Sequence, residues 1–277
     1  MNTHPLSRLS SERADHTRAR ILNAAVQQFS TKGLAGARTE QIAEAAGVNK
    51  ALLYYYFKSK DALYAAALES IFEEIHAASL AVMKADAPVG ERLLQIVLGN
   101  FDRAYSLPVM QSLMQQEMVR LHRGEENRMA QMAEKYFKPW WTSMEKMIDQ
   151  GIFSGELIDV DRAQMRYAIF GPNVFYFLSA PLTRLTFDIE PLDRDVLEHR
   201  RKAVLHYLGK TIFTDREHGA YLVEKVLAET PMPWNDQAAN RVAMIKKLKT
   251  TAADGNGSVT ALIGNENDLK STIVRPE

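Results

Sequence analysis

The stretch Arg38–Leu63, RTEQIAEAAGVNKALLYYYFKSKDAL, combines features that neither a buried segment nor a linker normally shares. Three adjacent tyrosines, Tyr54–Tyr56, lie between Lys50 and the Lys58–Lys60 segment. A buried segment repeats apolar residues at one period, and a flexible linker contains few aromatic residues. The hydroxyl and ammonium groups of this stretch therefore indicate a surface that contacts a polar partner.

The local pattern predicts two short helices joined by a tight turn. We expect Thr39 to cap a helix over Glu40–Ala46, because a threonine hydroxyl can accept from a free N–H at a helix start. Gly47 then permits the positive φ of a turn. Asn49 is expected to cap a second helix over Lys50–Phe57. A helix, a glycine turn and a short helix form the helix-turn-helix arrangement.

Burial should divide the second of these helices into two sides. Leu53 and Phe57 are one turn apart and are expected to face the core. Tyr54 and Tyr56 could both be amphipathic residues at the edge of the core, and for Tyr56 this is the interpretation that we favour over DNA contact.

The outward side of the second helix is suited to duplex DNA. The N-terminal residues of such a helix can meet base edges in the major groove. Lys50 can reach guanine or a phosphate, and Ala51 and Leu52 can contact a thymine methyl group. Tyrosine hydroxyls and the N–H groups of helix starts bind phosphates. The predicted DNA-contacting residues are Thr39, Asn49, Lys50, Ala51, Leu52, Tyr54, Tyr55 and Lys60.

The charge distribution fits a polyanionic partner for the N-terminal part. The whole chain has 34 basic and 34 acidic residues, but residues 1–60 contain nine Lys and Arg residues against four acids. The first 60 residues thus carry a formal charge of +5 and the remainder −5. A basic patch is the electrostatic footprint of a nucleic-acid-binding surface. Chance clustering explains the charges alone equally well.

The segment Gly47–Leu63, GVNKALLYYYFKSKDAL, resembles the recognition segment of the TetR family of transcriptional regulators. Upstream, Ile21–Gly33 and Thr39–Ala46 fit the same pattern, so the resemblance covers about residues 17–70. Asn49 stands where serine is usual and Ala51 where glycine is common. These two departures bear on which operator sequence is recognised, and not on whether the protein binds DNA.

The resemblance implies a homodimer that binds a palindromic double-stranded DNA operator, usually as a repressor. It implies base-edge roles near Lys50–Leu52 and phosphate roles for Thr39, Tyr54, Tyr55 and Lys60. It also implies a C-terminal helical domain in which a ligand changes the spacing of the recognition helices and releases the DNA.

Helical periodicity dominates the sequence and predicts an all-α fold. We expect a first helix over Ser11–Thr31 and a fourth helix, capped by Ser59, from Lys60 to about Lys84. Further helices are expected over 89–105, 108–122, 125–150, 161–184, 193–212, 215–229 and 235–249.

The expected domains follow from these helices and from the resemblance. A three-helix helix-turn-helix DNA-binding domain precedes a larger helical domain for ligand binding and dimerisation, with a flexible segment at each end. The predicted divisions are a flexible arm (1–16), the DNA-binding domain (17–63), the ligand-binding and dimerisation domain (64–213), extra C-terminal helices (214–250) and a flexible tail (251–277).

A ligand is expected between helices of the 65–180 region, where aromatic residues and methionines are frequent. This inventory of aromatic residues and methionines, with few central charges, suggests a small apolar or aromatic effector. For any single methionine, ordinary core packing is the favoured alternative. The candidate residues are Phe72, His76, Phe101, Tyr105, Met114, Met118, Tyr136, Trp140, Phe170, Asn173 and Phe177.

Gly171-Pro172 interrupts a helical pattern and could open space for a ligand. Proline removes a backbone donor and kinks a helix, and Asn173 would supply a polar group beside the kink. Two shorter helices that simply meet at this point are an equally good alternative.

Dimerisation is expected to use the helices over 161–184 and 193–212, which would form a four-helix interface across a two-fold axis. The segment 214–249 is expected to dock on the rest of the protein, because Trp234 and the stripe Val242, Ile245 and Leu248 are apolar.

An enzyme and a helical interaction scaffold are the two alternatives. The chain lacks the common catalytic and nucleotide-binding motifs, and His199 with His206 makes a weak metal site without a third ligand. A scaffold leaves the basic Thr39–Lys60 segment unexplained. We therefore predict a protein that is not an enzyme, with no catalytic residues, metal or cofactor.

Composition supports a protein of the cytoplasm. Of the 277 residues, 46% are apolar and 25% are charged, which permits one large domain or two modest ones with a real core. The absence of cysteine excludes disulfides and thiol catalysis and suits a reducing compartment. No apolar run is long enough to cross a bilayer, and the N-terminal residues lack the apolar centre of a secretion signal, so no membrane partner is expected.

Overall fold

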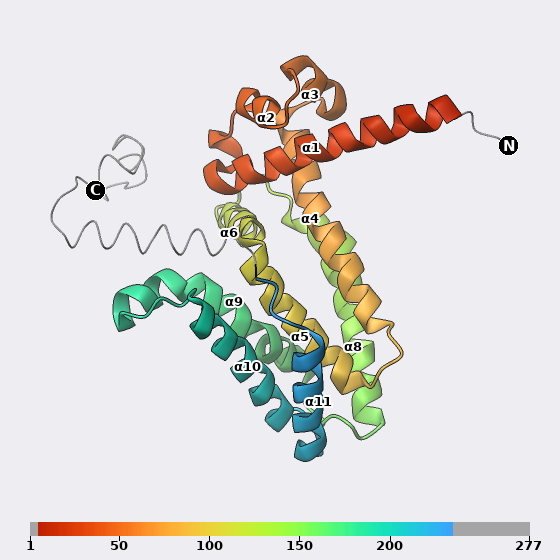
Figure 1. The fold of residues 1–277 in the computed structure, drawn as a ribbon, viewed down its shortest axis with the longest axis vertical. Helices are drawn as coiled ribbons and strands as arrows, with labels where there is room; N and C mark the ends of the chain where they lie inside the picture. Colours follow the sequence, from red (N-terminus) through yellow and green to blue (C-terminus); the bar gives the residue numbers. More distant parts are fainter. Residues whose placement is uncertain (1–4, 235–277) are drawn as a thin grey trace. The chain divides into compact units, whose positions relative to one another are not determined.

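The computed structural model describes residues 5–234, and within this range the secondary structure is helical apart from one isolated bridge between Leu157 and Phe213. This confirms the all-α prediction (Figure 1). The elements are α1 (Pro5–Gly36), α2 (Thr39–Ala45), α3 (Lys50–Phe57), α4 (Lys60–Met83), α5 (Val89–Ser106), α6 (Pro108–His122), α7 (Met129–Met132), the π-helix η1 (Ala133–Phe137), α8 (Lys138–Phe153), α9 (Arg162–Phe187), α10 (Arg194–Thr211) and α11 (Arg216–Glu229). Between Pro5 and Glu229, none of these helices has the length and apolar character needed to span a bilayer.

The described residues form two compact units. The first contains residues up to 178 together with 201–231, and the second contains 179–200 and 232–234. The second unit is held by an ion pair in which the Arg184 guanidinium donates to both carboxylate oxygens of Glu190, each at 2.6 Å. The first unit contains both hydrophobic cores and all the predicted site residues.

One core of the first unit joins α1–α4 with α6 and η1. Ile21 and Phe29 of α1 are fully buried, as are Ile42 of α2 and Leu53 of α3. The ring of Tyr64 on α4 meets that of Phe29 edge to face at 4.9 Å. The start of α4 therefore belongs to the same packed body as the three N-terminal helices, at one end of the long α4 (Figure 1).

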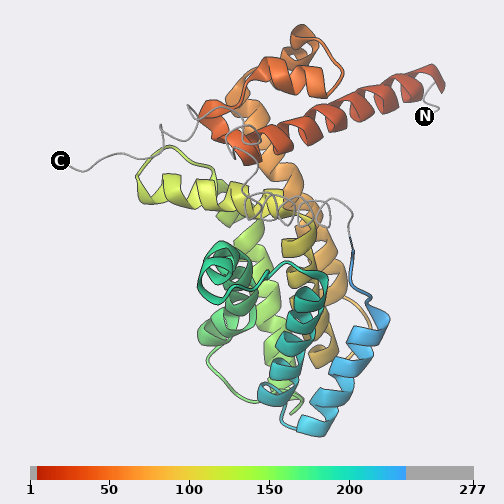
Figure 2. The same ribbon diagram turned by 60° about the vertical axis from the view of Figure 1, so that its left-hand side comes forward.

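A second core packs α5 and α8 with parts of α9, α10 and α11. Leu93 and Val97 of α5 and Val223 and Val226 of α11 have no exposed surface. The end of α10 and α11 lie side by side (Figure 2). The helix predicted over 215–229 is thus part of the core. The helix predicted over 235–249, with its apolar stripe, and the tail over 251–277 lie outside the described residues.

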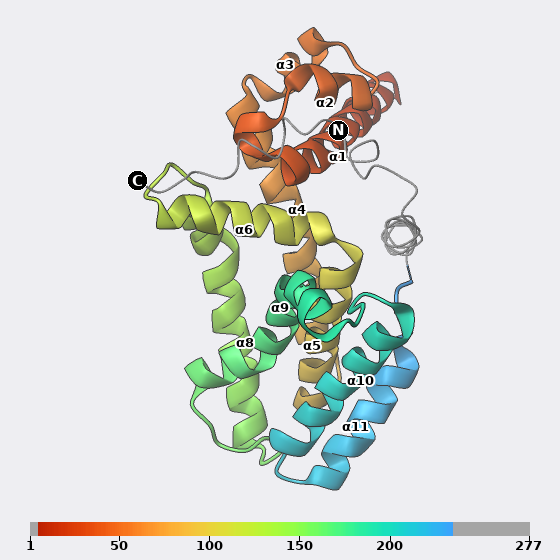
Figure 3. The same ribbon diagram turned by 90° about the vertical axis from the view of Figure 1, so that its left-hand side faces the viewer.

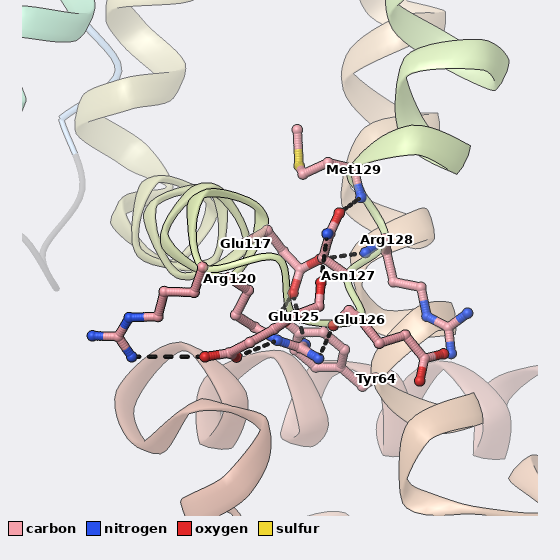
Figure 4. A network of polar contacts seen from close by, with 9 residues as sticks. Tyr64, Glu117, Arg120, Glu125, Glu126, Asn127, Arg128 and Met129 are labelled. Carbon is pink, nitrogen blue, oxygen red and sulfur yellow. Dashed lines mark hydrogen bonds and ion pairs between the residues drawn. The ribbon is translucent and has the colours of Figure 1, made fainter.

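A buried polar network connects α4 to α6 and the following loop (Figure 4). Glu117 of α6 is only 1% exposed, and its carboxylate accepts from the Tyr64 hydroxyl at 2.9 Å and from the Arg120 guanidinium at 3.0 Å. Its second oxygen accepts from the backbone N–H of Arg128 at 2.6 Å. The carboxylate is therefore well compensated for its removal from water.

Two boundaries in the N-terminal part differ from the sequence predictions. The first helix begins at Pro5 rather than Ser11, so it includes most of the residues expected to form an arm. Gly33 interrupts it with φ 68°, close to the predicted end. Thr39 does not cap the second helix: it is the first residue of α2, and Arg38 occupies the N-cap position without a side-chain hydrogen bond.

Two predictions for the later helices also need correction. The helix predicted over 125–150 begins at Met129, contains the π-turn of η1 and runs to Phe153. Gly151 lies inside this helix and does not end it. The glycine faces the side chains of Leu157 and Val89, where a larger residue would collide, so it serves close packing. Across Gly171-Pro172, α9 is a single helix, so the alternative of two helices meeting there is wrong.

Candidate DNA-binding site

The turn between α2 and α3 is held in place by α1. Gly47 has φ 64°, a conformation that side-chain-bearing residues rarely adopt. Its N–H donates to the Glu44 carbonyl at 2.9 Å. Arg20 of α1 donates to the carbonyl of Ala46 and, at 3.1 Å, to that of Gly47. The three helices are therefore joined at the turn by one guanidinium group.

The orientation of α3 follows from its cap and its two buried residues. The Asn49 side chain accepts from the Leu52 N–H at 2.7 Å, which confirms the predicted cap. Leu53 and Phe57 are buried in the core, as predicted. Ala51 is consequently exposed on the opposite side, at the N-terminal end of α3.

The predicted base contact Lys50 has an intramolecular partner. Its ammonium group forms an ion pair with Glu40 of α2 and lies 5.9 Å from the centre of the Tyr54 ring. Hydrogen bonding to Glu40 raises the pKa of Lys50 and lowers that of the carboxylate. Both side chains are more than half exposed, and exposed pairs contribute little free energy. DNA can therefore compete for this lysine at small cost.

The tyrosines of α3 differ from one another in environment. The Tyr54 hydroxyl lies 3.2 Å from the Thr39 hydroxyl, and Thr39 itself is buried. Tyr55 is 68% exposed, and its ring meets that of Tyr56 edge to face at 5.4 Å. Tyr56 packs partly against the core. The structure thus leaves Tyr55 as the most accessible hydroxyl of the three and pairs Tyr54 with Thr39.

The start of α4 is fixed by a cap and by a lysine. Ser59 accepts from the Ala62 N–H at 3.0 Å, which confirms the predicted cap. The Lys60 ammonium donates to the Ala35 carbonyl at 3.1 Å and so ties α4 to the end of α1. Lys58, which precedes the cap, lies 5.6 Å from the Tyr55 ring centre. This leaves two ammonium groups and one exposed hydroxyl near the end of α3.

Two contributing residues, Arg20 and Glu40, were not predicted from the sequence, and Lys58 was part of the predicted polar surface but was not named as a DNA contact. Arg20 holds the turn, Glu40 pairs with Lys50, and Lys58 lies over Tyr55. For Lys58, its position directly after the aromatic run was an available signal. Arg20 and Glu40 are respectively 27 and 10 residues from their partners, so no local spacing indicates these contacts.

The residues predicted to bind a ligand fall into separate clusters. On the side of the N-terminal core, the rings of Phe72 and Tyr136 are stacked at 6.1 Å, and His76 meets Tyr136 at 5.7 Å. Met114 packs against the same core, whereas Met118 is exposed. Phe72, Met114 and Tyr136 thus pack with the N-terminal helices.

The other predicted ligand residues lie in the helical body. The rings of Trp140 and Phe170 are in contact at 5.4 Å, and those of Phe101 and Phe177 at 5.1 Å. Tyr105 is buried on α5, one turn beyond Phe101. These contacts bring α5, α8 and α9 together within the first unit (Figure 3).

A turn held by α1, a capped α3 and an outward-facing row of Lys50, Ala51 and Tyr55 define a helix-turn-helix protein. Residues 21–67 match the family model of the bacterial regulatory proteins, tetR family. The N-terminal part of the chain is therefore similar to the TetR family of regulatory proteins, as its resemblance indicated.

Curated relatives are similar mainly in the N-terminal part. The transcriptional repressor NicS of Pseudomonas putida is 34% identical over 121 residues, which cover 44% of this chain and 56% of that protein. The transcriptional regulator RutR of Escherichia coli K12 is 57% identical over 53 residues, 19% of this chain and 25% of RutR. The chain thus matches about half or less of the length of these relatives.

Solved structures of similar fold extend further along the chain. A transcriptional regulator from Saccharomonospora viridis, solved in complex with choline, superposes with a TM-score of 0.58 and 18% identity. The superposition covers 72% of this chain and 98% of that one. At this identity, the superposition shows that the helical body shares the fold of that structure, and it carries no conclusion about a ligand of this chain.

Proposed function

We propose that this protein is a DNA-binding transcriptional regulator, a repressor that binds a palindromic operator as a homodimer and is released by a small ligand. The observation that carries the proposal is α3: its cap and buried residues turn Lys50, Ala51 and Tyr55 to solvent together. A helix presented in this way can enter the major groove with its N-terminal end at base edges. This role implies a cytoplasmic location.

The DNA contacts divide into two kinds. Lys50, Ala51 and Leu52 at the start of α3 are proposed to read bases, with Asn49 holding the helix start close to the backbone. Tyr55 and Lys60 are proposed to contact phosphates, together with the hydroxyl pair of Thr39 and Tyr54.

An exposed apolar face supports the homodimer. Tyr167, Val174 and Leu178 are seven and four residues apart on α9, so they lie on one side of this helix, and Phe175 is adjacent to them. Each of the four is at least half exposed. A contiguous apolar face of this kind is typical of a surface that another protein covers. Two copies related by a two-fold axis would place their recognition helices about one DNA turn, roughly 34 Å, apart.

Ligand release is proposed to operate through α4. The start of α4 packs in the N-terminal core, and its cap Ser59 follows α3 directly. A ligand in the helical body that favours another position of α4 would displace α3 from the spacing that DNA requires. The ligand acts only through its difference in affinity for the two positions.

A mobility-shift assay on the DNA that flanks the protein's own gene tests the proposal. We expect preference for one palindrome over unrelated DNA and an affinity that falls steeply with salt, because phosphate contacts release counterions. An absence of sequence preference at every salt concentration would contradict the proposal and favour an enzyme or a scaffold.

A further inference from the structure

Arg103 on α5 is a cation inside the helical body without a carboxylate partner among the described residues. Its guanidinium folds back over Gly99, with Nη1 3.1 Å from the position that a Cβ there would occupy. Its hydrogen bond to the buried hydroxyl of Ser79 on α4 is long, at 3.5 Å. Burial lowers the pKa of Arg103, but a guanidinium remains charged in proteins.

Two other enclosed cations of this unit are paired with carboxylates. Arg201 donates to both carboxylate oxygens of Asp102, at 2.7 and 2.8 Å. Lys225 pairs with Glu91 at 2.8 Å. Asp102 is next to Arg103 in the chain, but both of its oxygens are taken by Arg201. Asp102 therefore acts on Arg103 only through its charge, and an enclosed guanidinium without a hydrogen-bonded carboxylate is costly.

Asn173 on α9 supplies a second incomplete polar group. Its side chain has no exposed surface, and its Nδ2 donates to the Val97 carbonyl at 3.1 Å and to Asn100 Oδ1 at 3.3 Å. The Val97 carbonyl can only accept, so the amide cannot be turned over. The Asn173 Oδ1 atom is therefore left buried without a hydrogen-bond partner in the described structure.

Arg103 lies on α5, and Asn173 contacts α5 from α9. Asn100, which accepts from Asn173, is three residues before Arg103 on α5, and residues at this spacing are neighbours on a helix. One turn beyond Asn173 on α9, the ring of Phe177 contacts that of Phe101 at 5.1 Å. Asn100 thus lies between the cation of Arg103 and the open acceptor of Asn173.

We propose that the helical body binds an organic carboxylate with an apolar part, whose carboxylate is held by the Arg103 guanidinium. A hydrogen-bond donor on the ligand satisfies the Asn173 Oδ1. A guanidinium binds a carboxylate through two parallel hydrogen bonds, which a neutral group cannot reproduce. The inference deepens the proposed function, because it rests on the ligand being the effector that releases DNA.

The same arginine connects the ligand to α4. Its hydrogen-bond partner Ser79 lies on α4, the helix that begins directly after the cap of Ser59. A carboxylate that takes over the guanidinium replaces the contact to Ser79 by a stronger, charge-assisted one. The affinity of the ligand then differs between arrangements of α4, as release of DNA requires.

Titration calorimetry with matched pairs of compounds tests this inference. The probes are benzoate, phenylacetate, 4-hydroxyphenylacetate and octanoate, each compared with its methyl ester, on the full-length protein. We expect at least one carboxylate to bind while its ester binds about tenfold or more weakly, because hydrogen bonds to charged groups are the stronger ones. The Arg103→Met variant should lose this preference, and Arg103→Lys should retain part of it.

Arg92→Met is the matched control. Arg92 lies on the same helix and is also partly enclosed, with its Nη1 donating to the Met83 carbonyl at 2.5 Å. Its replacement should leave carboxylate binding unchanged. Circular dichroism melting establishes that each variant is folded. The inference is overturned if no carboxylate binds, if ester and acid bind equally, or if Arg103→Met binds like the unaltered protein.

The mobility-shift assay separates this inference from the proposed function. Arg103→Met should bind operator DNA like the unaltered protein but keep it bound when the carboxylate is added. If the unaltered protein shows no sequence-specific DNA binding, the proposed function as a regulator is contradicted, whatever the calorimetry gives. DNA binding that persists without any carboxylate response would contradict only the ligand assignment.

Discussion

The exposed hydroxyl of Tyr55 is available to a phosphate without breaking any contact within α3. We predict that Tyr55→Phe weakens binding to operator and unrelated DNA alike, by about three- to tenfold, because one hydrogen bond of about 1 kcal/mol is lost. Lys60→Ala should also weaken binding to both kinds of DNA. It should reduce the slope of log affinity against log salt concentration by about one, because one phosphate contact is lost. Fluorescence anisotropy over a salt series measures these effects, and a loss confined to the operator would argue against a phosphate role.

Lys50 should act differently, because it lies at the N-terminal end of α3. Lys50→Ala is predicted to change the preference among operator variants, with about 1–3 kcal/mol lost at the base pair that it contacts. Competition binding with single-base operator variants detects this change. Lys58→Ala is the control, since Lys58 lies beyond the C-terminal end of α3. Unchanged base preference in Lys50→Ala would show that the assumed orientation of α3 in the groove is wrong.

The buried Tyr64 predicts a pH dependence of stability. Burial, and then its hydrogen bond to Glu117, raise the pKa of this hydroxyl above its ordinary value of about 10. The folded state therefore holds the proton more tightly than the unfolded state, and stability falls as the pH rises above about 10. In Tyr64→Phe this fall should be smaller, as measured by urea unfolding at about pH 8 and about pH 10.5. Tyr55→Phe serves as the exposed control, and an equal fall in all three proteins would contradict the assignment.

At the scale of one element, α3 depends on its cap. Asn49→Ala should destabilise the protein by about 1 kcal/mol, because the Leu52 N–H loses its acceptor. Asn49→Ser should restore most of the stability, since serine also caps helices. Thermal unfolding gives the stability, and mobility shift gives the effect on DNA affinity. Equal stability of the alanine and serine variants would mean that the cap contributes nothing.

At the scale of the whole molecule, the proposed DNA binding should depend on pairing of two copies. Phe175→Glu places a charge on the exposed face of α9, where Phe175 is 66% exposed, and should convert the dimer into a monomer. Operator affinity should then fall by at least about a hundredfold, because only one recognition helix can bind at a time. Phe153→Glu is the matched control, because Phe153 on α8 is 95% exposed away from this stripe. Light scattering measures the mass, and a dimeric Phe175→Glu would exclude α9 from the interface.

The helix-turn-helix could be predicted from the sequence because its determinants are local. Asn49 and Ser59 each cap a helix through an N–H three residues away, and the Gly47 conformation is a property of the residue itself. Leu53 and Phe57 are buried because their spacing matches one helical turn. The predicted cap at Thr39 was wrong because its hydroxyl meets that of Tyr54, a contact between helices.

What the sequence by itself determined is the type of fold, the recognition helix and the side of that helix that faces solvent, since these depend on interactions within about one helical turn. The tertiary structure alone decided that Arg20 holds the turn, that Glu117 joins α4 to α6 and that Arg103 has no carboxylate partner in the described part of the chain. Each of these depends on which distant segments pack together, and close packing of long helices is a property of the folded chain that no local spacing contains.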